Sequence, residues 1–333
     1  MSIGLKDIAE LVGMSVSTVS RALRDDPRVN VKTRQRIRLI AKNLNYLPNQ
    51  AAKSLVTKKT MTIGLVLPNL RSFMHDIFDG LERVLSEAGY NILLGVSDGD
   101  PVKEMHELKL LMEKRVDGLI LFYVGGVFNQ NSIRFLNTIN IPLVLVDRYI
   151  PRSKFDFVVS DNENGSKALV DYILDLGRHK IAFIMQKEDA TALKDRLKGF
   201  YDSILGRGIK LRKDYVQSGE GAHIETGYRC TERLLSLDDP PDAIIGSTGD
   251  ITIGVVKYVT ENTGMHDRLM IAGFDDFEYL SLLKIPVSTV KQRTTEMGRE
   301  AAIILLERTK GLSEDQKRVF LQTELVKRHG LTG

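Results

Sequence analysis

Several features that are common in other protein classes are missing from this sequence. Its 333 residues include one cysteine and no tryptophan, and no apolar run reaches about eighteen residues. The single Cys230 cannot form an internal disulfide, which fits a protein of the reducing cytoplasm. The lack of a long apolar run argues against a membrane-spanning helix. The opening residues, MSIGLKDIAELVG, combine acids with an amphipathic pattern and are therefore not a secretory signal.

Motifs of several enzyme and cofactor classes are absent or incomplete. There is no P-loop and no H-E-x-x-H, and Gly219-Glu220-Gly221 lacks the third glycine of a dinucleotide fingerprint. Residues 95–99 match G-x-S-x-G after an expected strand, but that hydrolase motif needs a later Asp and His, and no histidine stands in a recognisable signature. No histidine pair has metal-ligand spacing with partners. We therefore expect no catalytic residue, no metal and no cofactor.

What is present is an ordinary globular composition with an uneven distribution of charge. Apolar residues make up 43% and charged residues 27%, and the length suits two or three domains. Residues 1–60 contain twelve Lys/Arg and four Asp/Glu, a balance of +8, whereas the remaining 273 residues have a balance of −4. A small basic module on a mildly acidic body suggests a nucleic-acid-binding head. The alternative is a merely solvated basic face.

The first sixty residues have the pattern of short helices. Leu5 to Val12 shows helical spacing of apolar residues, Gly13 interrupts it, and Ser15 can cap a second helix, while a third is expected from about Lys32 to Asn43. This is the spacing of a helix-turn-helix, whose second helix enters the DNA major groove. Two amphipathic helices joined at a glycine are also common in ordinary bundles.

From Thr62 onward, apolar strands alternate with amphipathic helices. The expected strands are Ile63–Leu67, Ile92–Val96, Gly118–Phe122, Leu143–Val146, Ile181–Met185, Ala243–Gly246 and Met270–Gly273. The expected helices lie near 74–88, 102–114, 131–139, 163–176, 192–206, 225–236 and 250–263. This rhythm predicts parallel sheets with helices on both faces and a ligand at the carboxyl ends of the strands. About 270 residues are more than a single hydrophobic core usually accommodates, so we expect two sheets.

Particular motifs add a family resemblance to this pattern. They are Leu5–Ala9, Gly13–Leu23, Leu44–Asn49, Ala51–Leu55, Arg115–Gly118, Val146–Arg148, Ser160–Asn162, Leu176–Ile181, Arg196–Phe200 and Gly273–Asp276. In order and over nearly the whole chain, they resemble the lactose-repressor/galactose-repressor family. The resemblance implies an all-α helix-turn-helix head with a hinge helix, joined to an α/β core of two Rossmann-like parallel-sheet subdomains, as in periplasmic binding proteins.

The resemblance also implies domain boundaries. Residues 1–48 would be the DNA-binding domain, 49–60 the hinge helix and linker, and 61–333 the ligand-binding and dimerisation core. The N-subdomain would comprise about 61–160 and 292–321, and the C-subdomain about 161–291 and 322–333. The protein would bind a pseudo-palindromic double-stranded operator as a homodimer, because one head reads only a few bases.

The DNA-binding residues that the resemblance implies fall on two segments. On and before the second helix they are Ser15, Val16, Ser17, Thr18 and Arg21, and in the hinge they are Asn49, Ala52, Lys53 and Leu55. Hydroxyl groups can donate to phosphates or bases, and Arg21 can make a bidentate contact to guanine. Leu55 would be an apolar wedge that kinks the minor groove. Without the preceding Tyr46–Asn49 motif, a capping contact on the core would be the better interpretation of Leu55.

For a small-molecule effector, the matching positions are Phe73, Arg148, Asp161, Arg196, Asp250 and Asp275. Carboxylates and guanidinium groups together suit a polyhydroxylated ligand, most simply a sugar, because each hydroxyl can both donate and accept. Phe73 or Phe274 would offer an apolar face for a sugar ring. Each residue also has a structural alternative, since Asp161 and Asp275 stand at strand ends, where Asp serves as a cap, and Asp147-Arg148 could be only an ion pair.

The chain departs from the family pattern at several cleft positions. Ala190 and Ala192 replace residues that are often polar, Gly249 stands where sugar-responsive members often have Asn, and residues 71–74 read Arg-Ser-Phe-Met. Without tryptophan, no indole ring can serve as a stacking platform. These departures bear on the class of ligand and not on the fold.

Together these features predict a cytoplasmic transcriptional regulator, a repressor whose operator affinity is controlled by a small ligand between two core subdomains. The mechanism would be linkage, because a ligand that favours one subdomain arrangement alters hinge-helix pairing. Whether the ligand acts as inducer or corepressor stays open. The alternatives are a solute-binding protein of the same core fold, which the basic head opposes, and a sugar-modifying enzyme.

Overall fold

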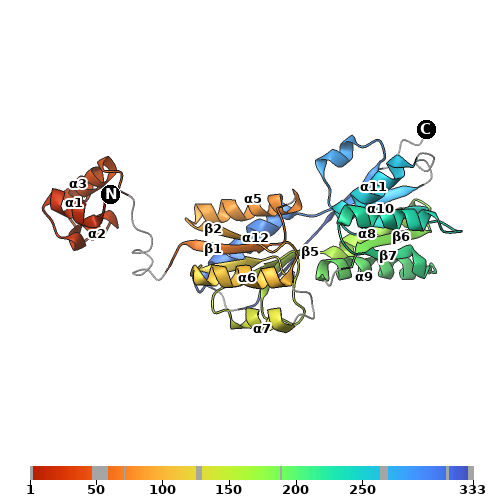
Figure 1. Ribbon diagram of the computed structural model, residues 1–333, viewed down its shortest axis with the longest axis horizontal. Coiled ribbons are helices and arrows are strands. Elements are labelled where there is room, and N and C mark those ends of the chain that lie inside the picture. Colours follow the sequence, from red (N-terminus) through yellow and green to blue (C-terminus); the bar gives the residue numbers. More distant parts are fainter. Residues whose placement is uncertain are drawn as a thin grey trace. The chain divides into compact units, whose positions relative to one another are not determined.

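The chain forms two separate structural units. The computed structural model describes residues 3–46, 59–70, 72–124, 130–187, 190–262, 269–312 and 315–328 (Figure 1). The units are Met1–Thr60 and Met61–Gly333. The hinge helix that was predicted within residues 49–60 falls on residues outside the described ones, which resume at residue 59.

The first unit is a bundle of three helices. They are α1 (Leu5–Val12), α2 (Val16–Leu23) and α3 (Val31–Asn43). Gly13 ends α1 with a φ of 67°, a left-handed conformation in which the lack of a Cβ avoids strain. Ser15 then caps α2, because its Oγ accepts a hydrogen bond from the Thr18 backbone N–H at 3.2 Å. Ile8, Val19 and Ile37, one from each helix, have no exposed surface and form the centre of the core. The predicted helix-turn-helix is confirmed.

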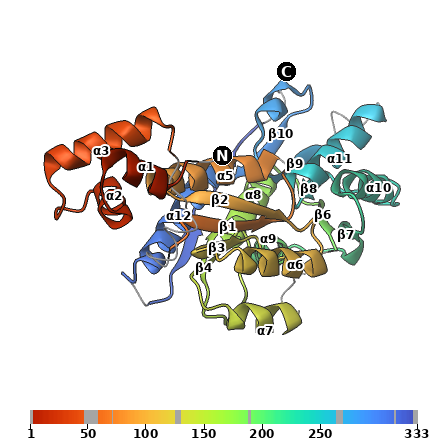
Figure 2. The ribbon, with the colours of Figure 1, turned by 60° about the vertical axis from the view of Figure 1, so that its left-hand side comes forward.

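The second unit contains two sheets of six strands. The first has the order β11-β5-β4-β3-β1-β2, and all its pairings are parallel. Figure 2 shows β2, β1, β3 and β4 side by side in that order. Its strands are β1 (Thr62–Leu67), β2 (Asn91–Val96), β3 (Gly118–Leu121), β4 (Leu143–Val146), β5 (Asp156–Ser160) and β11 (Arg318–Leu321). One face packs on α5 (Ser72–Glu87) and α12 (Thr294–Thr309), and the other on α6 (Pro101–Glu113) and α7 (Gln130–Thr138).

The second sheet has the order β12-β10-β9-β8-β6-β7. Its strands are β6 (Ile181–Gln186), β7 (Val216–Gly219), β8 (Ala243–Gly246), β9 (Met270–Phe274), β10 (Val287–Lys291) and β12 (Glu324–Val326). β12 pairs antiparallel with β10, and the remaining pairings are parallel. One face packs on α8 (Asn162–Asp175) and α9 (Thr191–Gly206), the other on α10 (His223–Leu235) and α11 (Gly249–Glu261). Two short 3-10 helices, η1 (Lys213–Tyr215) and η2 (Glu278–Leu282), complete this half.

The chain passes between the two sheets three times. The crossings follow β5, β10 and β11, so α12 and β11 complete the first sheet long after its other strands, and β12 returns to the second. The predicted fold class, a helical head and two parallel-sheet α/β subdomains, is confirmed.

The elements that the sequence pattern missed have identifiable physical causes. All seven predicted strands and all seven predicted helices of the core are present, with ends within about two residues of the prediction, the usual uncertainty of element ends. The strands β5, β7, β10, β11 and β12 and the helix α12 were not predicted. β11 and β12 have only four and three residues. The centre of α12 reads AAIILL, a continuous apolar run whose helical period is hard to see because most of its surface is buried.

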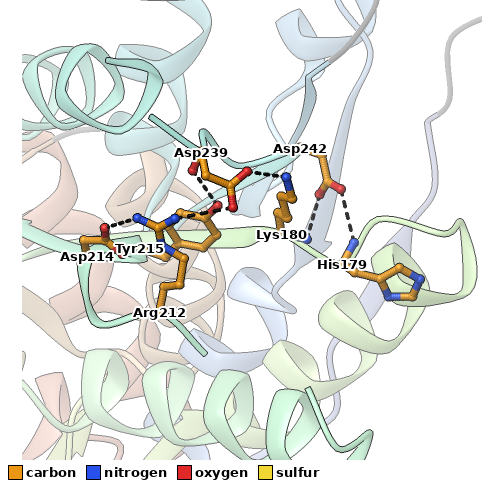
Figure 3. Close-up of polar contacts among 7 residues, drawn as sticks. All are labelled: His179, Lys180, Arg212, Asp214, Tyr215, Asp239 and Asp242. Atoms are coloured by element: carbon orange, nitrogen blue, oxygen red, sulfur yellow. Dashed lines mark hydrogen bonds and ion pairs between the residues drawn. The ribbon is translucent and has the colours of Figure 1, made fainter. Parts of the chain in front are cut away.

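A group of polar side chains closes the amino-terminal edge of the second sheet. This amino-edge cluster, drawn in Figure 3, consists of His179, Lys180, Arg212, Asp214, Tyr215, Asp239 and Asp242. Asp242, which precedes β8, accepts hydrogen bonds from the backbone N–H groups of His179 and Lys180 at 3.3 and 3.0 Å. The Lys180 ammonium pairs with Asp239. Because these charges pair with one another, the cluster ties together the starts of β6 and β8.

Candidate functional site

The helix α2 buries one side and presents the other to solvent. Val19 and Ala22 are fully buried, whereas Ser15, Val16, Ser17 and Arg21 are exposed. Val16 is 41% exposed, and its apolar side chain suits contact with a thymine methyl group. Four of the five predicted DNA-contacting residues of the head are therefore exposed, and the fifth, Thr18, is partly exposed.

Hydrogen bonds and charge organise this face further. The hydroxyls of Ser17 and Thr18 each lie 2.9 Å from Ser15 Oγ. On the following loop, the Arg28 guanidinium hydrogen-bonds the Asp26 carboxylate and holds the pKa of that group well below its usual range. Asn49, Ala52, Lys53 and Leu55 lie outside the described residues, so their hinge roles stay predictions.

A cavity of about 690 Å³ lies at the carboxyl ends of the strands of both sheets. From the first half, Asn69 follows β1, Asp98 follows β2, Val124 follows β3 and Asp147 follows β4. From the second half, Gln186 ends β6, Gly221 follows β7, Thr248 follows β8, Asp275 follows β9 and Gln292 follows β10. Parallel strands place their carboxyl ends at one edge of a sheet, where ligands of α/β proteins bind.

The structure brings five of the six predicted effector residues to this cavity. Phe73, Arg148, Arg196, Asp250 and Asp275 line it. Asp161 is not among the lining residues. Its carboxylate caps α8, accepting hydrogen bonds from the backbone N–H and side-chain amide of Asn164 at 3.2 and 2.7 Å.

Arg196 projects from α9 and is 3% exposed. Its Nε donates to Asn162 Oδ1 and its Nη1 to the Ser247 carbonyl oxygen, both at 2.7 Å. The guanidinium carbon lies 4.1 Å from the centre of the Phe274 ring. Burial lowers the pKa of Arg196, and the charges of Asp275 and Asp147 oppose that shift. Phe274 itself is fully buried beneath the guanidinium, so it offers no face to a sugar ring.

Asp147 and Asp275 occupy equivalent positions in the two halves. Each is the first residue after a strand, and each has a left-handed backbone, with φ of 67° and 69°. Each donates its backbone N–H to the neighbouring strand at 3.0 Å, Asp147 to Val158 and Asp275 to Val290. Burial raises the pKa of Asp147, and the nearby Asp275 charge raises it further, whereas Arg148 and Arg196 lower it. The two carboxylates thus face one shared space from opposite walls.

Hydrogen bonds hold the Asp275 carboxylate in place. Its Oδ2 accepts from the Gly249 backbone N–H at 2.9 Å, and its Oδ1 accepts from Gln292 Nε2 at 2.6 Å. Gly249 is the first residue of α11, so the carboxylate also lies where the helix dipole favours negative charge. Asp275 is fixed before any ligand arrives.

Several lining residues were not identified from the sequence. They include Asn69, Asp98, Gln186, Phe277 and Gln292. Their common signal is position, since each stands at or within a few residues of the carboxyl end of a strand. Position could have identified the lining residues that follow the predicted strands β1, β2, β6 and β9. It could not have identified Gln292, because β10 was not predicted.

Other kinds of site are not found in the described part of the chain. The residues that the structure describes contain no group of three or more His, Cys, Asp or Glu side chains able to hold a metal ion. Among the same residues, no helix is both long and apolar enough to cross a membrane.

Comparisons with known proteins agree with this architecture. Residues 4–49 match the family described as bacterial regulatory proteins, lacI family, and residues 170–330 match the periplasmic binding protein-like domain. The chain is 30% identical to the HTH-type transcriptional regulator RegA of Clostridium saccharobutylicum, over 98% of this chain and 99% of RegA. It is 28% identical to the ribose operon repressor of Haemophilus influenzae, over 98% of each chain. The crystal structure of the Lac repressor dimer bound to operator and the anti-inducer ONPF superposes with a TM-score of 0.87 at 23% identity, over 98% of each chain.

Proposed function

Because the chain belongs to the lacI family of bacterial regulatory proteins, whose members are transcriptional regulators and not enzymes, we propose that it is a repressor controlled by a carbohydrate effector. The effector binds the cavity between the two halves of the core, and binding changes the affinity for a pseudo-palindromic operator. The active species is a homodimer, because a single α2 reads too few bases to specify a site.

The observation that supports this proposal is that residues at the strand ends of both sheets line the same cavity. A ligand there contacts Asp147 and Arg148 from one half and Arg196, Asp250 and Asp275 from the other. It therefore favours the arrangement of the halves in which both sets of contacts are made. Residues 49–60 connect the core to the head and would transmit that preference to DNA.

The charge of the wall supports a neutral, hydroxyl-rich ligand. Four carboxylates line the cavity, Asp98, Asp147, Asp250 and Asp275, against two guanidinium groups, Arg148 and Arg196. Ionised carboxylates only accept hydrogen bonds, and although Asp275 already accepts two and Asp98 pairs with Lys103, a ligand rich in donors fits this wall best. A polyol does so, whereas a phosphate or carboxylate ligand would add negative charge to an already acidic wall.

The proposal is tested in two stages with the full-length protein. Selection from randomised duplexes should enrich a pseudo-palindrome, and sedimentation at micromolar concentration should show a dimer. Fluorescence anisotropy on the selected duplex should then change when a sugar that raises the melting temperature of the protein is added, because ligand binding stabilises the folded state by mass action. Sugar binding without enrichment of any sequence would favour the solute-binding alternative.

A further inference from the structure

Two aromatic rings line the cavity, Phe73 and Phe277, and the second lies close in sequence to the carboxylate of Asp275. Phe277 lies two residues after Asp275, is partly exposed and lines the cavity. Its ring stacks on Tyr279, with the centroids 5.2 Å apart and the planes 16° from parallel. Tyr279 thus covers one face of the ring.

Gly249 makes room for this ring. A Cβ placed on Gly249 would lie 2.3 Å from Phe277 Cε2 and 2.9 Å from Cζ, closer than any real contact of carbon atoms. The edge of the ring therefore rests against the backbone at the start of α11. Any side chain at position 249 would therefore clash with the Phe277 ring in its present position.

The polar groups nearest to the ring suit the rim of a sugar. Asp250 directly follows Gly249, and Asp275 accepts a hydrogen bond from the Gly249 backbone N–H at 2.9 Å. Ligand sites commonly combine apolar or aromatic surface with a few fixed polar groups that set orientation. A pyranose or furanose ring matches both, because its C–H face is apolar and its rim carries hydroxyls.

Resting on the proposed function, we propose that Phe277, admitted by Gly249, is the stacking platform that makes this cleft selective for the ring form of a sugar. Aromatic side chains provide large apolar contact area at a fixed geometry. The acceptor-rich wall distinguishes a sugar from a heteroaromatic base, which would also stack but brings few donors. Phe277 is therefore a specificity-determining residue, and Gly249 positions it.

The absence of native tryptophan permits a direct test. Phe277→Trp places the sole tryptophan of the full-length chain in the cavity. Its emission should change saturably on titration with at least one of D-glucose, D-ribose, cellobiose and maltose. Phe135→Trp is the matched control, since Phe135 is also partly exposed but packs outside the cavity against the first sheet, and its emission should not change. A response to hypoxanthine and to none of the four sugars would overturn the proposal, as would no response at all.

A second set of variants tests the role of Gly249. For the sugar that responds, Phe277→Ala and Gly249→Ala should each weaken binding in calorimetry at least tenfold, whereas Phe135→Ala should not. In the Phe277→Ala background, adding Gly249→Ala should have little further effect, because the ring that it displaces is absent and the remaining close atom, Asp275 Cβ at 3.2 Å, needs to move only slightly. Additive losses would overturn the positioning role. If Phe277→Ala keeps its sugar affinity and sugar still changes DNA binding, Phe277 is not the stacking platform, but the proposed regulatory function stands.

Discussion

Tyr149 and Asp195 join the two halves of the core beside the cavity. The Tyr149 hydroxyl donates to the Asp195 carboxylate, with the oxygens 3.2 and 3.4 Å apart. The same tyrosine exchanges backbone hydrogen bonds with the Thr191 hydroxyl, at 3.0 Å from its N–H and 3.2 Å to its carbonyl oxygen. Tyr149 follows the cavity-lining Arg148, and Thr191 lies between the lining residues Ala190 and Ala192. Any movement of one half against the other must act on this contact.

The first prediction concerns the pH dependence of stability. Burial raises the pKa of Asp195 to about 6, with the Glu163 charge adding to the shift and the Tyr149 hydrogen bond, Lys198 and Arg196 opposing it. Since the folded pKa lies above the unfolded value, the favourable contribution is present below about pH 4 and is lost as the pH rises through 6. In urea unfolding between pH 4 and 7, the stability of wild type relative to Asp195→Asn should therefore fall as pH increases. The buried Asp147 titrates in both proteins and cancels in this comparison. A difference that is independent of pH would contradict the prediction.

The second prediction concerns DNA recognition. Arg21 is exposed on the same face of α2 as Ser17, so Arg21→Ala should lose discrimination at one base position by about 1–3 kcal/mol, as expected for a bidentate guanine contact. Arg36→Ala removes the same charge from an exposed position on α3 and is the control. Binding assays on the selected duplex and its single-base variants distinguish a base-specific loss in Arg21→Ala from the general effect of removing a positive charge in Arg36→Ala. Uniform weakening on all sequences would show that Arg21 contacts a phosphate.

The third prediction concerns Asp275 as an effector contact. Asp275→Asn should fold normally, because Asn tolerates the left-handed backbone at this position, and should weaken effector binding at least tenfold, or about 1.4 kcal/mol. Asp275→Ala should lose as much affinity and also some folding stability, since Ala is strained at a φ of 69°. DNA binding without effector should be unchanged in both variants. Calorimetry that finds intact effector binding, alongside lost DNA binding, would assign Asp275 a structural role.

The fourth prediction separates stability from ligand binding. Asp242→Ala removes the acceptor of two backbone N–H groups in the amino-edge cluster and should lower the free energy of unfolding by about 1–3 kcal/mol. Effector affinity should not change, because the cluster lies at the opposite strand ends from the cavity. The exposed Asp238 provides the control, and Asp238→Ala should leave the melting temperature nearly unchanged. Equal effects of the two substitutions would show that the hydrogen bonds of Asp242 contribute little.

The sequence predicted the elements whose physical signal is local. Gly13 and Ser15 mark the turn of the head unambiguously, and isolated apolar runs such as Leu143–Val146 form the strands expected of them. The crossing segments were harder to predict, because β11 and β12 exist only through pairing with strands more than thirty residues away in sequence.

The same limit applies to the cavity. Family motifs pointed to Arg196 and Asp275, both of which line it, but also to Asp161, whose hydrogen bonds are used at the start of α8. Phe274 and Phe277 stand three residues apart, on either side of two aspartates, and only the tertiary structure shows that the first is buried and the second lines the cavity. Side-chain orientation at a strand end depends on packing that no local pattern encodes.

The three crossings between the sheets have a consequence for synthesis on the ribosome. The first sheet lacks its edge strand until Leu321 has been made, and α12, which covers one face, begins only at Thr294. By then every strand of the second sheet except β12 already exists. Domains of a continuous chain can fold in the order of translation, but here the first half stays incomplete while the second forms. The head, whose core includes residues up to Tyr46, can fold and meet DNA well before the cavity that is proposed to control it has been closed.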